Sequence, residues 1–211
     1  MTQIRVIFSA SLAGLALLGA LVFSSAAAWS APATPASVAY AVGDMALGAK
    51  DAPVTIIEYA SMTCPHCANF HLGPLKALKT KYIDTGKVRL IFREFPFDPV
   101  ALQAAMLARC AGEKRYFGML NVLFKNQLKW AKAANPQQAL ANIARLGGFT
   151  EARFQACMTS QALADQILQS RLDGSKEFDI DSTPSFIVNG VKTSGNMTIE
   201  KWDELLATHL K

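Results

Sequence analysis

The sequence predicts an α/β fold in which a mixed central sheet is interrupted by an inserted, all-helical block. Runs rich in β-branched and aromatic residues at 54–59, 88–95 and 184–193 indicate strands, whereas residues 98–172 show no strand pattern. A Cys-Pro-His-Cys sequence follows the first of these runs. Two cysteines at this spacing can close a small disulfide and open it again, so the motif predicts redox chemistry at the start of a helix.

Residues 1–28 have the features of a secretory signal peptide. Arg5 is the only charge before a long apolar run, and Ala26-Ala27-Ala28 supplies the small residues that a signal peptidase needs, with cleavage expected after Ala28. The alternative is an uncleaved N-terminal anchor, because about 18 apolar residues can span a bilayer. Either way we expect the folded part outside the cytoplasm, where disulfides can persist.

Residues 29–43 are rich in Ala, Pro, Ser and Thr and are expected to form a flexible leader. The rest of the chain, 44–211, is long enough for one domain with its own core. The formal charge of +5 is modest and the lysines are scattered, which argues against nucleic-acid binding.

The first strand, the cysteine motif and the next helix form one unit. The apolar, β-branched residues 54–59 predict a strand buried on both faces. A helix is expected from Pro65 to about residue 84, because proline suits the first turn, and Pro74 should kink it. Residues 88–95 predict the next strand, and the βαβ order implies that the two strands are parallel.

A helical block then occupies residues 98–172. Its pattern is interrupted near Asn135-Pro136 and near Gly147-Gly148, where we expect one helix to end and another to begin. The block therefore lies between two parts of the α/β framework.

The chain closes with a hairpin and a helix. Residues 184–188 and 191–193 indicate two strands, and Asn189-Gly190 between them is a strong signal for a tight hairpin turn. A last helix is expected over residues 198–210, with Thr198 as its N-cap. The order β-α-β, helical block, ββα is that of a thioredoxin fold with a helical insertion.

The sequence motifs resemble those of the DsbA family of periplasmic thiol–disulfide oxidoreductases over most of residues 44–210. The Cys-Pro-His-Cys sequence is the specific feature, since other thioredoxin-like classes usually carry a different pair between the cysteines. A second cysteine pair resembles an arrangement in some α-proteobacterial and Gram-positive relatives. The matching positions are Glu58, Cys64-Pro65-His66-Cys67, Arg93-Glu94-Phe95-Pro96 and Thr183-Pro184.

The resemblance implies that Cys64 is the exposed nucleophile and Cys67 its buried partner. Exchange proceeds by thiolate attack through a mixed disulfide, and a helix N-terminus stabilises a thiolate through its free N–H groups and its dipole. His66 can add a hydrogen bond or a positive charge. We therefore expect a lowered pKa for Cys64. The dithiol carries two electrons by itself, so neither an organic cofactor nor a metal is expected.

Glu58 is an acid within an apolar strand, where carboxylates are uncommon without a partner or a role. The resemblance implies that Glu58 moves a proton to or from the buried cysteine. The alternative is a structural ion pair with a lysine such as Lys79 or Lys81. His71 is expected to be a surface or packing residue rather than a metal ligand.

Thr183 and Pro184 are the expected substrate-binding residues. The resemblance implies a cis peptide bond before Pro184, beside the active site, where the backbone of Thr183 can meet an extended peptide edge to edge. Family oxidases often carry valine before this proline, whereas threonine is common in isomerases and reductases of the fold. Thr183 therefore keeps a reductive role open.

Cys110 and Cys157 both lie in the helical block. An even number of cysteines in an exported protein suggests that these two form a structural disulfide. The alternatives are two separate buried thiols, or a pair that modulates the reduction potential of the active site.

Three functions follow from these features. The first is an enzyme that introduces disulfides into unfolded or reduced exported proteins through Cys64 and is reoxidised by a DsbB-type membrane partner. The second is an isomerase or reductase of the same compartment, kept reduced by a DsbD-type partner. Residues 29–43 are too short for a dimerisation domain, so we expect a monomer. The third is a chaperone-like binding module in which the cysteine motif is only structural.

Overall fold

The computed structural model describes residues 42–210. The signal peptide or anchor predicted over 1–28 lies outside the described residues, as does most of the leader predicted over 29–43. Within the part of the chain that is described, no helix is both long enough and apolar enough to cross a membrane.

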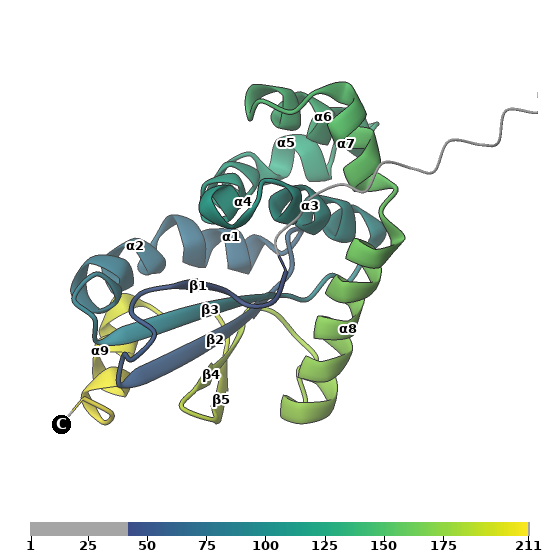
Figure 1. Cartoon of the computed structure of the whole chain (residues 1–211). Helices are drawn as coiled ribbons and strands as arrows, with labels where there is room; N and C mark the ends of the chain where they lie inside the picture. Colours follow the sequence, from purple (N-terminus) through teal and green to yellow (C-terminus); the bar gives the residue numbers. More distant parts are fainter. Residues whose placement is uncertain (1–41, 211) are drawn as a thin grey trace, which may run out of the picture. The chain divides into compact units, whose positions relative to one another are not determined.

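A mixed sheet with the strand order β1-β3-β2-β4-β5 forms the centre of the domain (Figure 1). Strands β2 and β3 are parallel, as the βαβ order predicts, and the other neighbouring pairs are antiparallel. β1 was not predicted, because three residues are too few to show an alternating pattern. The strands are β1 (Met45–Leu47), β2 (Val54–Ala60), β3 (Val88–Glu94), β4 (Ser185–Val188) and β5 (Val191–Ser194).

The helical connection from β2 to β3 is divided where the kink was predicted. α1 (Pro65–Leu72) ends at Gly73, α2 (Pro74–Leu78) begins at the proline, and a π-helix, η1 (Lys79–Ile83), continues to the next loop. Pro74 takes the first position of α2, where its missing N–H leaves no hydrogen bond unmade. The break lets α1 and α2 follow the same face of the sheet.

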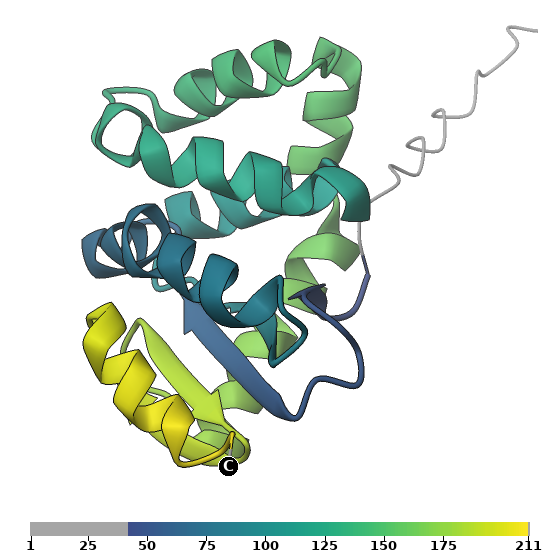
Figure 2. The ribbon, with the colours of Figure 1, turned by 90° about the vertical axis from the view of Figure 1, so that its left-hand side faces the viewer.

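The closing segment also covers this face. Asn189 and Gly190 both have positive φ and join β4 to β5 in the predicted two-residue turn. α9 (Ile199–Ala207) begins after Thr198, as predicted, and lies next to α2 (Figure 2). The apolar side chains shared by the sheet, α1, α2 and α9 include Val54, Ile56, Phe70, Leu78, Phe186 and Trp202.

The opposite face of the sheet is covered by α8 (Gln161–Phe178). The helical block was predicted to end near residue 172, but α8 continues through Gly174 to Phe178. A Cβ atom at position 174 would lie 2.5 Å from Cε1 of Tyr59, so only glycine allows the helix to pack this closely on β2. Gly174 therefore marks a close contact rather than the end of a helix.

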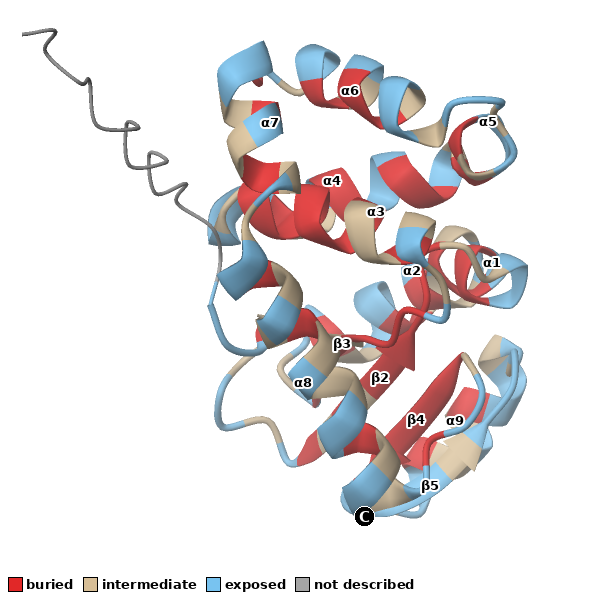
Figure 3. Ribbon diagram, turned by 90° about the vertical axis from the view of Figure 1, so that its right-hand side faces the viewer, coloured by how far each residue is buried: buried red, intermediate tan, exposed pale blue. Residues whose placement is uncertain are grey.

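The remaining helices of the block pack on one another beyond the end of the sheet (Figure 1). Both predicted interruptions are confirmed, because Asn135 caps α6 through the Gln138 N–H and α6 stops before Gly147. Buried positions face inward and exposed positions line the outside (Figure 3). The elements are α3 (Pro99–Cys110), the 3₁₀ helix η2 (Glu113–Arg115), α4 (Tyr116–Lys125), α5 (Gln127–Ala131), α6 (Pro136–Leu146) and α7 (Glu151–Met158).

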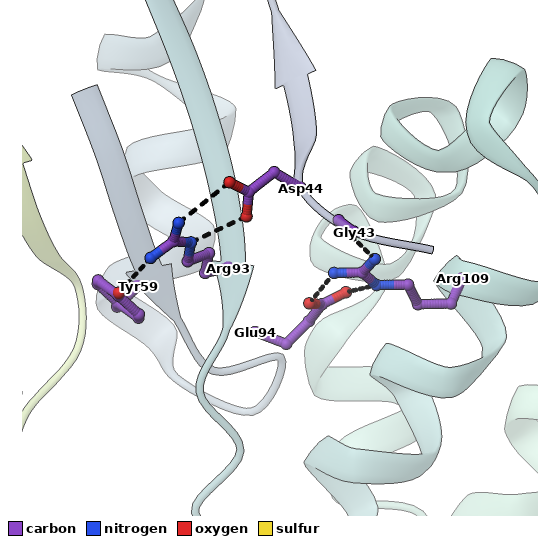
Figure 4. Close-up of polar contacts among 6 residues, drawn as sticks. All are labelled: Gly43, Asp44, Tyr59, Arg93, Glu94 and Arg109. Carbon is purple, nitrogen blue, oxygen red and sulfur yellow. Dashed lines mark hydrogen bonds and ion pairs between the residues drawn. The ribbon is translucent and has the colours of Figure 1, made fainter. Parts of the chain in front are cut away.

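Two forked ion pairs meet at the end of β3 (Figure 4). Arg109 of α3 donates from Nε and Nη2 to the two carboxylate oxygens of Glu94, each at 2.6 Å, and both side chains are buried. On the neighbouring position, Arg93 donates to both oxygens of Asp44 and to the hydroxyl of Tyr59. The Arg109–Glu94 pair joins the helical block to the sheet. The Arg93–Asp44 pair holds the segment before β1 against β3.

Candidate active site

Cys64 lies just after β2, at the point where the chain enters α1. It is the N-cap residue of α1, with Pro65 in the first helical position, and its Sγ accepts the backbone N–H of Cys67 at 3.3 Å. A sulfur in this position faces the N–H groups and the positive end of the helix dipole, which favour an anion.

The pKa of Cys64 is lowered from its usual value to about 5. The main cause is the hydrogen bond with the Cys67 side chain. The Thr183 side chain and the backbone N–H groups of Cys67 and His66 act in the same direction, while partial burial opposes them. The direction agrees with the prediction from sequence. At neutral pH, Cys64 is therefore a thiolate, the form that attacks a disulfide.

Cys67 has the opposite character. It lies one turn into α1, is fully buried, and its pKa is raised, first by burial and then by its hydrogen bond with Cys64 and the negative charges of Cys64 and Glu58. The motif therefore holds one reactive thiolate and one protonated thiol, both free in this structure. Any reaction in which Cys67 leaves or attacks must move a proton.

His66 contributes less than the sequence suggested. Its imidazole is exposed and makes no hydrogen bond with the described residues, whereas its backbone N–H lowers the pKa of Cys64. The structure therefore does not contain the suggested hydrogen bond from the His66 side chain among the described residues, and a contribution from its charge stays a prediction.

Thr183 and Pro184 come to the active site from the loop before β4. The peptide bond between them is cis, as the resemblance implied. Sγ of Cys64 lies 3.3 Å from the Thr183 carbonyl oxygen, to which Cys64 donates when it is protonated. Pro184 is buried and Thr183 is partly exposed. Residues that lie 119 positions apart in the sequence thus form the two sides of one site.

Glu58 is fully buried on β2 and pairs with His71 of α1. The imidazole Nε2 lies 3.0 Å from each carboxylate oxygen of Glu58. The alternative of a lysine partner is wrong, because Lys79 pairs with Asp84 and Lys81 pairs with Asp203, both at the surface. His71, predicted to be a surface or packing residue, is a packing residue: it lies one turn beyond Cys67 on α1, is buried, and its ring packs on Phe92 and Phe124.

Gln127 of α5 is a site residue that the sequence analysis missed. Its buried side-chain amide donates to the carbonyls of Met62 at 2.8 Å and Cys64 at 2.9 Å. The helical block also contacts this segment through Asp98, the N-cap of α3, whose carboxylate accepts the hydroxyl of Thr63 at 2.7 Å. The only signal in the sequence was a polar residue next to the buried face of a short helix, which is too common to be informative.

Cys110 of α3 and Cys157 of α7 are both buried. Their sulfur atoms lie 2.05 Å apart, and their Cα atoms 6.2 Å apart, so the structure contains a bond between these two helices. Over residues 42–210, no group of three or more histidine, cysteine or acidic side chains is placed to hold a metal ion.

Residues 40–208 match the family model described as Thioredoxin. A protein of Rickettsia typhi, provisionally named as a protein-disulfide oxidoreductase, is 39% identical over 151 residues, which are 71% of this chain and 56% of that protein. The chain thus spans little more than half the length of this curated relative.

Two solved structures share the architecture. Alpha-DsbA1 of Wolbachia pipientis superposes with a TM-score of 0.74 and 31% identity, covering 80% of this chain and 91% of that chain. Oxidised BdbD of Bacillus subtilis superposes with a TM-score of 0.71 and 20% identity, covering 84% of this chain and 99% of that chain. The second similarity is one of fold alone, whereas the first extends to sequence.

Proposed function

Because this chain belongs to the DsbA family of the thioredoxin fold, we propose that it is a thiol:disulfide oxidoreductase that acts on other proteins through Cys64. The observation that carries the proposal is the contrast within one motif. Cys64 is accessible and its pKa is lowered to about 5, while Cys67 is buried and its pKa is raised. This pairing suits a nucleophile and a resolving thiol.

In the oxidising direction, a substrate thiolate attacks Sγ of Cys64, and the Cys64–Cys67 bond breaks. Cys67 leaves with the bonding electrons and takes up a proton, for which Glu58 is the proposed source. A second substrate thiolate then attacks the substrate sulfur of the mixed disulfide and releases Cys64 as a thiolate. Two electrons pass from the substrate to the protein, and the substrate gains a disulfide.

The low pKa of Cys64 favours this direction. A stabilised thiolate is a good leaving group and stabilises the reduced form, so the oxidised form becomes a stronger oxidant. We propose that the protein introduces disulfides into exported proteins in the periplasm, as a monomer, and is reoxidised by a membrane partner of the DsbB type.

The substrate would be held next to Thr183 and Pro184. The backbone of Thr183 reaches the Cys64 sulfur, and a proline has no N–H that would compete for hydrogen bonds with an extended chain. Recognition through backbone groups would accept many sequences, which suits unfolded proteins as substrates.

An isomerase or reductase is the second candidate, and Thr183 is the observation that favours it. In that case a DsbD-type partner would keep the cysteine pair reduced. The two candidates are separated by the reduction potential of the Cys64–Cys67 pair in a glutathione buffer. A value of about −120 mV supports the disulfide donor, and a value of about −200 mV or lower supports the isomerase or reductase.

The test of the exchange function is the oxidation of a reduced, unfolded protein by the oxidised form of this protein. We expect that Cys64→Ser abolishes the reaction. Reduced Cys67→Ser, mixed with a protein substrate that already contains a disulfide, should accumulate a mixed disulfide through Cys64, because the variant has no second thiol to resolve it. A Cys110→Ala/Cys157→Ala variant is the matched control and should still react. If Cys64→Ser retained full activity towards unfolded chains, the protein would instead be a chaperone-like binding module.

A further inference from the structure

We infer that His71 is a positioning residue for proton transfer at Cys67, acting through Glu58. In this inference, His71 holds the buried carboxylate in place and carries protons between it and the solvent. The inference rests on the proposed exchange function and extends it to a residue outside the Cys-Pro-His-Cys motif.

The geometry places three groups in series. Cys67 and His71 are four residues apart on α1, so their side chains share one face of the helix. Glu58 lies opposite them on β2, with both oxygens 3.0 Å from Nε2 of His71. The same carboxylate is close enough to Cys67 that its negative charge raises the pKa of that thiol.

The exposed fractions of the three residues indicate the route by which a proton would reach the solvent. Cys67 and Glu58 are 0% exposed, whereas His71 retains 6%. A proton that leaves Cys67 can reach Glu58 but cannot go from there directly to water. The imidazole has a second ring nitrogen besides the one that faces Glu58, so it can accept a proton on one side and release it on the other.

The surroundings of the pair are mostly apolar, and buried Tyr116 is a further titratable group whose electrostatics involve Glu58. The rings against the His71 imidazole belong to Phe70, Phe92 and Phe124, and none of them is ionisable. A buried carboxylate is stable only when it is paired or hydrogen-bonded, and Nε2 of His71 lies 3.0 Å from both oxygens of Glu58.

The proton follows the sulfur chemistry in both directions. When Cys67 attacks a mixed disulfide at Cys64, its proton goes to Glu58 and on through His71 to solvent, and the partner leaves as a thiolate. When the Cys64–Cys67 bond is broken by a substrate, Cys67 leaves as a thiolate and recovers a proton by the reverse route. The bond exchange supplies the electrons in each case.

The experiment separates the two steps in one reaction. The reduced protein is mixed with a large excess of a chromogenic aromatic disulfide, which releases one coloured thiolate when Cys64 attacks and a second when Cys67 resolves the mixed disulfide. We expect His71→Gln to leave the first release unchanged and to slow the second about 10-fold or more, since general acid–base groups contribute at least this much. Glutamine keeps an N–H donor towards Glu58 but cannot carry a proton.

The pH profile of the second release is the further readout. In His71→Gln this profile should differ from that of the wild type, because the variant has no imidazole to accept and release the proton. Glu58→Gln should slow the second release as well, and the double variant should be no slower than Glu58→Gln alone, because His71 acts through Glu58. Phe124→Leu, which loosens the packing on the same imidazole, is the control and should keep the wild-type profile.

A second release in His71→Gln with the rate and pH profile of the wild type would overturn the inference, as would slowing in the double variant equal to the product of the single effects. These outcomes leave the proposed function intact, because the first release still reports the reactivity of Cys64. The proposed function fails separately if the wild-type protein shows no first release.

Discussion

The two thiols of the active site differ because they occupy different positions on one helix. Cys64 is the N-cap of α1 and accepts the Cys67 N–H, whereas Cys67 lies inside the helix against the core. Cys64 has a lowered pKa mainly because of its hydrogen bond with the Cys67 side chain, with backbone N–H groups helping, whereas burial raises the pKa of Cys67. The resulting difference in pKa sets which thiol reacts first.

This difference predicts the pH dependence of alkylation. In the reduced protein, the rate at which iodoacetamide modifies Cys64 should be half-maximal near pH 5, because the pKa of Cys64 is lowered to about 5 and only the thiolate reacts. The rate should be flat from about pH 7 upward, with Cys67 unmodified. Mass spectrometry of peptides after timed quenching measures both.

The control for this titration is Cys67→Ala. It removes the side-chain hydrogen bond that is the main cause of the low pKa of Cys64 but keeps the backbone N–H of residue 67, so the midpoint should move to higher pH. A wild-type midpoint near the ordinary cysteine value of about 8.5 would contradict the structural account of the site.

Single residues of the site were predictable to different degrees. Cys64, Cys67, Thr183 and Pro184 could be identified because a short motif fixes their chemistry. The partner of Glu58 could not, because it depends on which side chains of α1 turn inward, and the periodicity of an eight-residue helix is a weak guide to that. Gln127 reaches its site across 63 residues, which no local pattern records.

Among the elements, the contact between α3 and α7 depends on a covalent bond as well as on packing. The bond from Cys110 to Cys157 closes a loop of 47 residues. A cross-link of this length restricts the unfolded chain, and the chain-entropy relation gives a stabilisation of up to about 4 kcal/mol. We propose that its role is structural.

We therefore expect the Cys110→Ala/Cys157→Ala variant to lose up to about 4 kcal/mol of unfolding free energy in urea titrations. The wild-type protein under strong reductant is the matched control, since it loses the bond but keeps both sulfur atoms in the core. A stability of the variant equal to that of the oxidised wild type would rule out a structural role and favour a pair that only modulates the active site.

Most elements were predicted because their local signals are strong. The buried strands, the Asn-Gly hairpin and the Asn-Pro start of α6 each carry a pattern that few other structures share. β1 and the end of α8 were missed for a common reason. β1 forms by pairing with the edge of β3. Gly174 lies within α8 because the absence of a side chain there lets the helix pack on Tyr59. Both depend on partners distant in sequence.

At the scale of the whole molecule, the site depends on a fixed position of the helical block relative to the sheet, because each of them supplies part of the site. The sheet carries Glu58 and leads into Cys64, and the block reaches back through Gln127 and Asp98 to the turn that holds Cys64. The ion pair between Glu94 and Arg109 joins the same two layers through buried, two-pronged hydrogen bonds (Figure 4).

We predict that Arg109→Leu lowers the unfolding free energy by about 3–5 kcal/mol, because it leaves the carboxylate of Glu94 buried without a cation. Urea titration measures the loss. Arg93→Leu is the matched control. Its pair with Asp44 is partly exposed, so the loss should be no more than about 1 kcal/mol.

The double variant Glu94→Leu/Arg109→Leu distinguishes an unpaired charge from lost packing. If the cost of Arg109→Leu comes from the carboxylate left behind, removing that carboxylate should restore much of the stability. A double variant at least as unstable as Arg109→Leu would show that the arginine acts mainly through its packing and its hydrogen bond to the Gly43 carbonyl. Either result identifies what keeps the two halves of the active site together.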